Sequence, residues 1–257
     1  MNTSDLKPLG IEITDLALDK VDARSVALLR NLLAESGVVV MRRQTIDDDI
    51  FLQFLHTFGE MAFTEGEVPL EGYPELNFVS NIGRTTPPRS NFHVDTSYVS
   101  APPAYTALRA VQVPASGGAT VFTNQYRAYE TLPKDIRTQL KGRTIRHVVS
   151  GLELGPDSET EAEHLIFRPH PLTGRVALYL STPQRCVAIS GMDPDGSREM
   201  IEYLFAHSTR EDNQLRHAWA EGDVVMWDNG CVLHKADHSG VVGDRVMHRG
   251  MVARYAA

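Results

Sequence analysis

The chain has 257 residues, of which 42% are hydrophobic and 23% charged, and its formal net charge is −8 at pH 7. The negative charge argues against nucleic acid as a partner, since no basic stripe is present to neutralise phosphates. Two cysteines without a CxxC pair and an N-terminus without an apolar signal core predict a cytoplasmic protein, and no apolar run approaches the ~18 residues of a membrane span.

The N-terminal part of the chain predicts two helices around a buried strand. Apolar residues at helical spacing favour a helix over residues 22–36, and the run VVVM at 38–41 indicates a strand. Residues 45–60 predict a second helix, with Thr45 as its N-cap. The Gly- and Pro-rich stretch 64–90 is too long for a simple connector, so we expect it to form a binding loop.

From residue 93 onward the pattern is mainly β, with turn signals between short apolar runs. Strands are predicted at 104–113, 119–124, 144–149, 165–171, 175–181, 222–229 and 245–255. Helices are expected near 125–141 and over 197–208, and the acidic stretch 151–164 predicts a mobile loop. This order indicates one domain over 1–257, mainly β with flanking helices, built as a sandwich, barrel or jelly roll.

The segment NFHVDTSYV, residues 91–99, contains a candidate metal site. If 91–95 is a strand, His93 and Asp95 project from the same face, because side chains alternate along a strand. His234 is a candidate third ligand, and two histidines with one carboxylate are typical of non-haem Fe(II) oxygenases. An HxD pair alone also fits an ordinary strand edge with two polar residues. A zinc hydrolase is a further alternative, although the chain lacks the HExxH motif of that class.

Two arginines near the C-terminus strengthen the oxygenase interpretation. Arg245 and Arg249 are four residues apart in an apolar run, so a regular strand places both on one face. Arginine is suited to bidentate recognition of carboxylates, and an oxygenase of this type needs the dicarboxylate 2-oxoglutarate as co-substrate. The alternative is that both arginines lie on the surface and pair with acidic residues.

Several motifs in fixed order resemble the TauD/TfdA family of Fe(II)- and 2-oxoglutarate-dependent dioxygenases. They are the FHVD segment, the Pro-Pro segment at 102–103, the GGAT turn at 117–120, WDNGCVLH at 227–234, and RVMHRGMVARY at 245–255. The resemblance runs from about residue 58 to the C-terminus. It implies a double-stranded β-helix, or jelly roll, with Fe(II), 2-oxoglutarate and O2 as the reacting partners.

The resemblance also implies roles for individual residues. His93, Asp95 and His234 match the iron ligands, and Thr120 and Arg245 match the pair that holds the distal carboxylate of 2-oxoglutarate.

Other matched positions concern the substrate. Arg249 matches the second arginine, which lies near the keto-acid end and in sulfonate-using members holds the substrate anion. Thr96 and Tyr98 match positions of the substrate pocket.

The chain departs from the family pattern at informative places. Ala62 stands where the taurine enzymes carry a sulfonate-binding histidine, which argues against taurine as substrate. Gly230 replaces the usual arginine after WDN, and Arg89 stands where a polar amide is common. Asp95 favours hydroxylation, since halogenating relatives usually replace this carboxylate with a small residue.

The expected function is oxidation, by hydroxylation in the first instance, of an unactivated C–H in a small anionic or amino-acid-like substrate, with release of succinate and CO2. Desaturation and cleavage of a C–S or C–O bond remain alternatives within the family. A non-catalytic metal-binding module of the cupin type is a further alternative. The sequence leaves the oligomeric state open, although relatives often assemble as dimers or tetramers.

Overall fold

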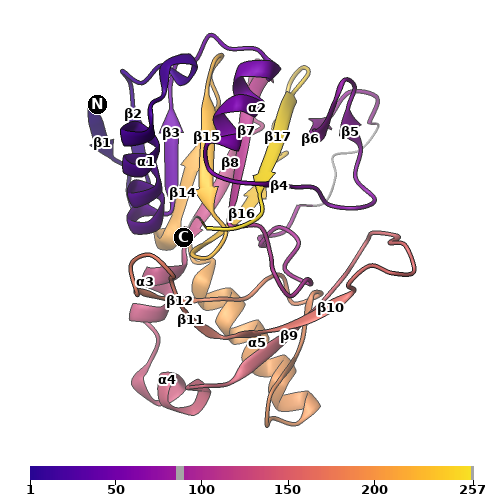
Figure 1. The fold of residues 1–257 in the computed structure, drawn as a ribbon. Coiled ribbons are helices and arrows are strands. Elements are labelled where there is room, and N and C mark those ends of the chain that lie inside the picture. Colours follow the sequence, from indigo (N-terminus) through magenta and orange to yellow (C-terminus); the bar gives the residue numbers. More distant parts are fainter. Residues whose placement is uncertain (85–89, 256–257) are drawn as a thin grey trace.

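The computed structural model describes residues 1–84 and 90–255, and its largest unit is a broad β-sheet (Figure 1). The strands of this main sheet run antiparallel except for the pair β2 and β3. Their spatial order is β1 (Thr3–Asp5), β2 (Ile11–Ile13), β3 (Val38–Met41), β15 (Val224–Asp228), β7 (Tyr105–Gln112), β17 (Val246–Val252), β6 (Tyr73–Ser80) and β5 (Pro69–Leu70), and β4 (Met61–Ala62) also pairs with β17.

A second, smaller sheet packs against the main sheet and completes the jelly roll. Its order is β14 (Gln214–His217), β8 (Thr120–Asn124) and β16 (Val232–Ala236). Apolar side chains from both sheets share one core, in which the rings of Phe122 and Trp227 lie 5.4 Å apart. The prediction of a mainly β jelly roll with flanking helices is therefore confirmed.

Two helices cover the other face of the main sheet (Figure 1). They are α1 (Ala23–Ser36) and α2 (Asp48–His56), which follow the short 3₁₀ helix η1 (Leu18–Lys20) and β3 respectively. Side chains alternate along a strand, so β3 contributes Val38 and Val40 to the core between the sheets, and Val39 and Met41 to the core beneath the helices. Burial on both faces explains why this strand is a continuous apolar run.

The capping of α2 corrects the sequence prediction. Asp47, rather than Thr45, is the N-cap, and its carboxylate accepts a hydrogen bond from the backbone N–H of Ile50 at 2.9 Å. The helix also ends at His56, so the predicted range 45–60 is too long at both ends. An aspartate that accepts from the third residue of the helix is a sufficient N-terminal signal, and the preceding threonine is not needed.

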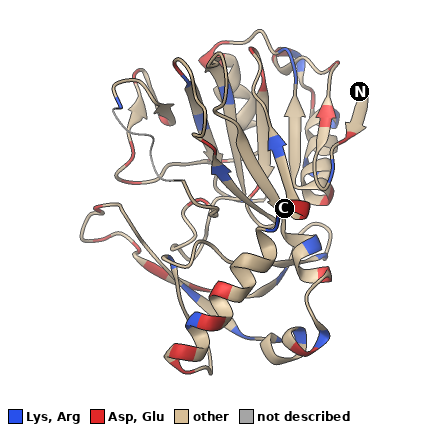
Figure 2. Ribbon diagram, turned by 180° about the vertical axis from the view of Figure 1, so that it is seen from behind, with Lys and Arg blue, Asp and Glu red and all other residues tan. Residues whose placement is uncertain are grey.

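The segment 125–208 forms the lower part of the molecule in Figure 1. Its elements are α3 (Gln125–Glu130), α4 (Lys134–Leu140), β9 (Thr144–Val148), β10 (Glu161–Leu165), β11 (Phe167–Pro169), β12 (Val176–Leu178), β13 (Cys186–Ile189) and α5 (Pro194–Ser208). The 3₁₀ helix η2 (Glu211–Asn213) then leads back to the smaller sheet. Figure 2 shows acidic and basic residues mixed along α5, without a stripe of one sign on that helix.

Two predictions for this segment are wrong in part. The helix predicted near 125–141 is divided into α3 and α4 around Pro133, whose ring removes a backbone donor and favours a helix start. Residues 161–164 of the predicted mobile loop belong to β10, which pairs with β9. The predicted hairpin is confirmed, since β11 and β12 are antiparallel partners. Across the residues described, no helix has the length and apolar character needed to span a membrane.

Candidate metal centre and its two cavities

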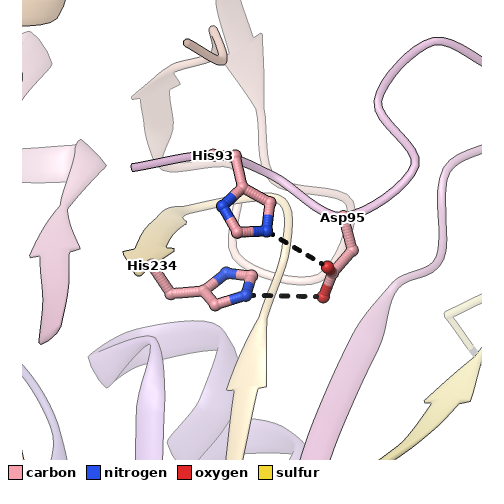
Figure 3. A group of neighbouring side chains, drawn as sticks. All are labelled: His93, Asp95 and His234. Carbon is pink, nitrogen blue, oxygen red and sulfur yellow. Dashed lines mark ion pairs between the residues drawn. The ribbon is translucent and has the colours of Figure 1, made fainter. Parts of the chain in front are cut away.

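Backbone pairing brings the two histidines of the predicted site together. The N–H of His93 donates to the carbonyl of His234 at 3.0 Å, and the N–H of His234 donates back to His93 at 3.0 Å. Residues opposite each other in such an antiparallel pair project their side chains from the same side. The two imidazole ring centroids are accordingly 4.4 Å apart (Figure 3). His234 lies on β16, a strand that the sequence pattern did not predict.

Asp95 reaches the same point from a turn rather than from a strand. The predicted strand 91–95 is only an isolated bridge at His93, and the chain turns from Asp95 onward, with Thr96 in the left-handed region at φ 47°. One Asp95 oxygen lies 3.6 Å from His93 Nε2 and the other lies 3.8 Å from His234 Nε2. All three candidate ligand atoms lie within 4.8 Å of one another, and Figure 3 shows them converging.

The protonation of this cluster suits a divalent metal ion. Burial lowers the pKa of His234 to about 3, so its imidazole is neutral at pH 7. Burial opposes ionisation of Asp95, but the two histidines and the Thr106 hydroxyl outweigh it and hold the pKa of Asp95 below its usual range. His93 Nδ1 lies 2.8 Å from the carbonyl oxygen of Asn91, which can only accept, so Nδ1 donates and Nε2 is the ring nitrogen left to bind a metal. Two neutral imidazoles and one carboxylate are the donor set expected for non-haem iron.

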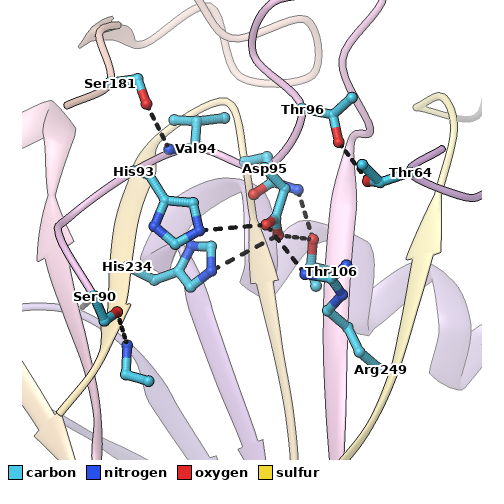
Figure 4. A network of polar contacts seen from close by, with 12 residues as sticks. Thr64, Ser90, His93, Val94, Asp95, Thr96, Thr106, Ser181, His234 and Arg249 are labelled. Carbon is cyan, nitrogen blue, oxygen red and sulfur yellow. Dashed lines mark hydrogen bonds and ion pairs between the residues drawn. The ribbon is translucent and has the colours of Figure 1, made fainter. Parts of the chain in front are cut away.

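A buried hydrogen-bond relay orients the carboxylate (Figure 4). The Thr106 hydroxyl donates to Asp95 Oδ2 at 2.7 Å and accepts from the Asn229 amide at 2.9 Å. The indole N–H of Trp227 in turn donates to Asn229 Oδ1 at 3.2 Å. The sequence carries no signal for Thr106, and for Asn229 the only signal is its place in the WDN motif.

A cavity of about 140 Å³, here called the inner cavity, opens beside the histidines. Its lining brings together residues from both sheets, namely Val79, Ser90, His93, Leu108, Thr120, Trp227, His234, Ala236, Arg245 and Arg249. Arg245 and Arg249 both line this cavity, in agreement with the expectation that they face the same way. The register of β17 and β7 shifts at Val111 of β7, which has no opposite residue. Because the extra residue lies in β7, side chains along β17 keep their regular alternation.

Thr120 and Arg245 meet at one wall of the inner cavity. Arg245 is 3% exposed, and its Nε donates to the carbonyl of Gly118 at 2.9 Å. The indole N–H of Trp219 donates to the Thr120 hydroxyl at 3.0 Å, so that hydroxyl is free to donate its own proton to a bound acceptor. Burial lowers the pKa of Arg245 to about 10, which still leaves the guanidinium charged at pH 7.

Arg249 lies closer to the candidate metal ligands and is surrounded by acceptors. Its Nη1 is 3.6 Å from Asp95 Oδ1 (Figure 4), and its Nη2 contacts the Asn77 amide oxygen at 3.2 Å. The same Nη2 forms an ion pair with Glu67, a residue of the stretch 64–90. The sequence gave no sign of Glu67, because 182 positions separate it from its partner.

Thr96 and Tyr98, the other predicted pocket residues that the structure describes, do not line the inner cavity. The Thr96 hydroxyl is hydrogen-bonded to that of Thr64 at 2.8 Å, and Tyr98 is 2% exposed. Arg89 lies outside the described residues.

Gly230, at the position of the family's usual arginine, is tightly surrounded. A side chain there would collide with the hydroxyl of Tyr255, which donates to Asp228 at 2.5 Å. The space of the missing arginine is thus partly taken by a tyrosine from the C-terminal tail.

Comparison with known proteins gives consistent matches over nearly the whole chain. Residues 2–251 match the family described as taurine catabolism dioxygenase TauD, TfdA family. The α-ketoglutarate-dependent 2,4-dichlorophenoxyacetate dioxygenase of Cupriavidus pinatubonensis is 30% identical, over 93% of this chain and 92% of that protein. The α-ketoglutarate-dependent sulfate ester dioxygenase of Pseudomonas putida is 29% identical, over 95% and 86%. A crystal structure of a taurine dioxygenase from Burkholderia xenovorans superposes with a TM-score of 0.85 at 30% identity, over 98% of this chain and 90% of that one.

Proposed function

The chain belongs to the TauD/TfdA family and is a 2-oxoglutarate-dependent non-haem iron dioxygenase, and from that premise we propose that it hydroxylates an unactivated C–H of a small anionic or amino-acid-like molecule, with release of succinate and CO2. The relatives act on different small molecules, according to their names, among them a dichlorophenoxyacetate and sulfate esters. Both classes are organic anions, which supports the substrate class but leaves the individual compound undecided.

We assign the metal to His93, Asp95 and His234. The observation that supports this assignment is the convergence of two imidazoles and a carboxylate within 4.8 Å, beside a cavity that carries two arginines. Fe(II) bound there, with 2-oxoglutarate and O2, would supply the oxidising power. The relay from Trp227 through Asn229 and Thr106 keeps the Asp95 carboxylate in one orientation.

We assign the distal carboxylate of 2-oxoglutarate to Arg245 and Thr120. Arg245 supplies a charged fork held in place by Gly118, and Thr120 supplies a hydroxyl proton directed by Trp219. Arg249, 3.6 Å from Asp95, is suited to balance negative charge at the keto-acid end. Glu67 already compensates the positive charge of Arg249, so Arg249 is poorly suited to bind a separate substrate anion as well.

The test is a binding experiment followed by turnover. Protein loaded anaerobically with Fe(II) and 2-oxoglutarate should show the weak visible charge-transfer band of a chelated keto acid, and exposure to air should produce succinate. His234→Ala and Asp95→Ala should abolish both signals, because a ligand is lost in each. His56→Ala, which removes a half-exposed histidine at the end of α2, is the matched control and should keep both.

The metal assignment is wrong if either ligand variant retains the band and forms succinate like the unmodified protein. The band does not require the substrate, so this test is independent of which molecule the enzyme oxidises.

A further inference from the structure

A second cavity, here called the outer pocket, also borders His93. Its volume is about 430 Å³, within the range of pockets for small organic ligands. Its lining is polar and consists of Ser90, Asn91, His93, Ser150, Gly151, Thr182, Gln184 and Arg185. Ser90 and His93 also line the inner cavity, so the two spaces meet at a candidate iron ligand.

Among the described residues that line the outer pocket, Arg185 is the one arginine, and no lysine, aspartate or glutamate accompanies it. Its backbone is fixed in the turn between β12 and β13, since its N–H donates to Thr182 at 2.8 Å and its carbonyl accepts from Val148 at 2.8 Å. The guanidinium Nε donates to the Ser150 hydroxyl at 3.2 Å. A neutral hydroxyl fixes the direction of the fork without compensating its charge.

The arginines near the candidate metal ligands differ in whether acidic side chains compensate their positive charge. Arg249 has Glu67 and Asp95 within ion-pair distance, and Arg245 faces the inner cavity. Within residues 1–84 and 90–255, no carboxylate lies within ion-pair distance of Arg185. A half-buried guanidinium without a paired carboxylate, beside a polar pocket, is well suited to bind a planar or tetrahedral anion.

We propose that Arg185 anchors the anionic group of the substrate, a carboxylate or a sulfate, in the outer pocket. The fork of Arg185 binds two oxygens of the anion, while the rest of the molecule extends past His93 toward the metal. This inference rests on the proposed function, and it moves substrate recognition from Arg249, which the sequence favoured, to a residue of the segment 125–208.

The test compares anions with neutral molecules that share the same organic scaffold. Protein loaded anaerobically with Fe(II) and 2-oxoglutarate is titrated in a calorimeter with 2,4-dichlorophenoxyacetate and its primary amide, and with hexyl sulfate and hexanol. The two pairs separate carboxylate from sulfate recognition. The unmodified protein should bind at least one anion roughly ten- to hundredfold more tightly than its neutral counterpart, as expected for a charge-assisted contact.

Two variants test whether Arg185 carries this preference. Arg185→Gln should remove the preference while leaving 2-oxoglutarate binding unchanged, and Arg185→Lys should restore part of it, because the charge returns without the fork. Arg198→Gln is the matched control. It removes an arginine that lines a neighbouring cavity together with Gln184 but pairs with Asp195, and it should leave the preference intact.

The outcomes separate this inference from the proposed function. If the charge-transfer band never forms, the proposed function fails first. If the band forms normally but Arg185→Gln keeps the anion preference, or if the unmodified protein prefers no anion of either pair, the role of Arg185 is wrong and the metal centre is unaffected.

Discussion

The inner cavity and the outer pocket meet at His93 but are built differently. The inner cavity is lined by side chains of hydrogen-bonded strands, with Thr120 on β8 and His234 on β16. The outer pocket is lined by turns, with Ser150 after β9 and Arg185 just before β13. Paired strands are less mobile than the loops that connect them, and loops tolerate more sequence change. If the proposed roles hold, the 2-oxoglutarate site is built mainly by paired strands, whereas the group that selects the substrate stands in a turn.

The largest expected effect comes from a substitution in the inner cavity that should weaken 2-oxoglutarate binding without affecting the outer pocket. Arg245→Ala should raise the 2-oxoglutarate concentration needed for half-maximal succinate formation by about a hundredfold, because a buried charge-assisted contact is lost. The affinity for Fe(II) and for substrate should change little. Titration of the charge-transfer band with 2-oxoglutarate measures the effect directly.

Arg216→Ala is the matched control for Arg245→Ala. Arg216 lies on β14 and pairs with Asp237, and its side chain is 52% exposed. An unchanged 2-oxoglutarate requirement in Arg245→Ala would move the distal-carboxylate anchor elsewhere, most directly to Arg249.

A smaller effect, on the affinity for Fe(II), is expected when a residue that contacts a candidate metal ligand is changed. Thr106→Val keeps the shape of the buried side chain but removes the hydroxyl that donates to Asp95. Loss of such an orienting partner typically weakens metal binding ten- to hundredfold, and we expect about the lower value, since Asp95 retains its contact with Arg249. Competition with a coloured chelator gives the Fe(II) affinity. Thr106→Ser restores the hydroxyl and should restore the affinity, and failure to do so would show that packing, not the hydrogen bond, is responsible.

The sequence could predict the inner cavity because its residues fall in motifs with regular spacing. His93 and Asp95 are two apart, and Arg245 and Arg249 are four apart in one apolar run. The relay through Thr106 could not be predicted, because it depends on β7 and the end of β15 lying side by side.

The outer pocket could not be predicted for a related reason. Ser150, Thr182 and Arg185 are ordinary polar residues in turns, and only the pairing of β9 with β13 brings them together. The neutralisation of Arg249 by Glu67 likewise depends on the path of a loop rather than on a local pattern. Local patterns determine strands and caps, whereas contacts between distant loops need the folded chain.

The smallest predicted effect concerns how the segment 125–208 is held together. Its core contains His147, which is fully buried and has its ring 5.1 Å from that of His164 and 5.7 Å from that of Tyr179. Burial lowers the pKa of His147 to about 3, whereas an unfolded histidine titrates near 6.5. Between these values the unfolded chain binds a proton that the folded chain does not. The free energy of unfolding therefore falls as the pH is lowered through about 6.5.

His147→Phe should remove this contribution while retaining an aromatic ring. Between pH 7 and about pH 5.5 the unmodified protein should lose about 1 kcal/mol more free energy of unfolding than the variant, as measured by urea denaturation at each pH. Tyr179→Phe is the control from the same cluster. Burial raises the pKa of Tyr179 to about 12, so its loss should leave the pH dependence unchanged. Parallel curves for the unmodified protein and His147→Phe would mean that His147 binds its proton in the folded chain as readily as in the unfolded chain, and the prediction would be wrong.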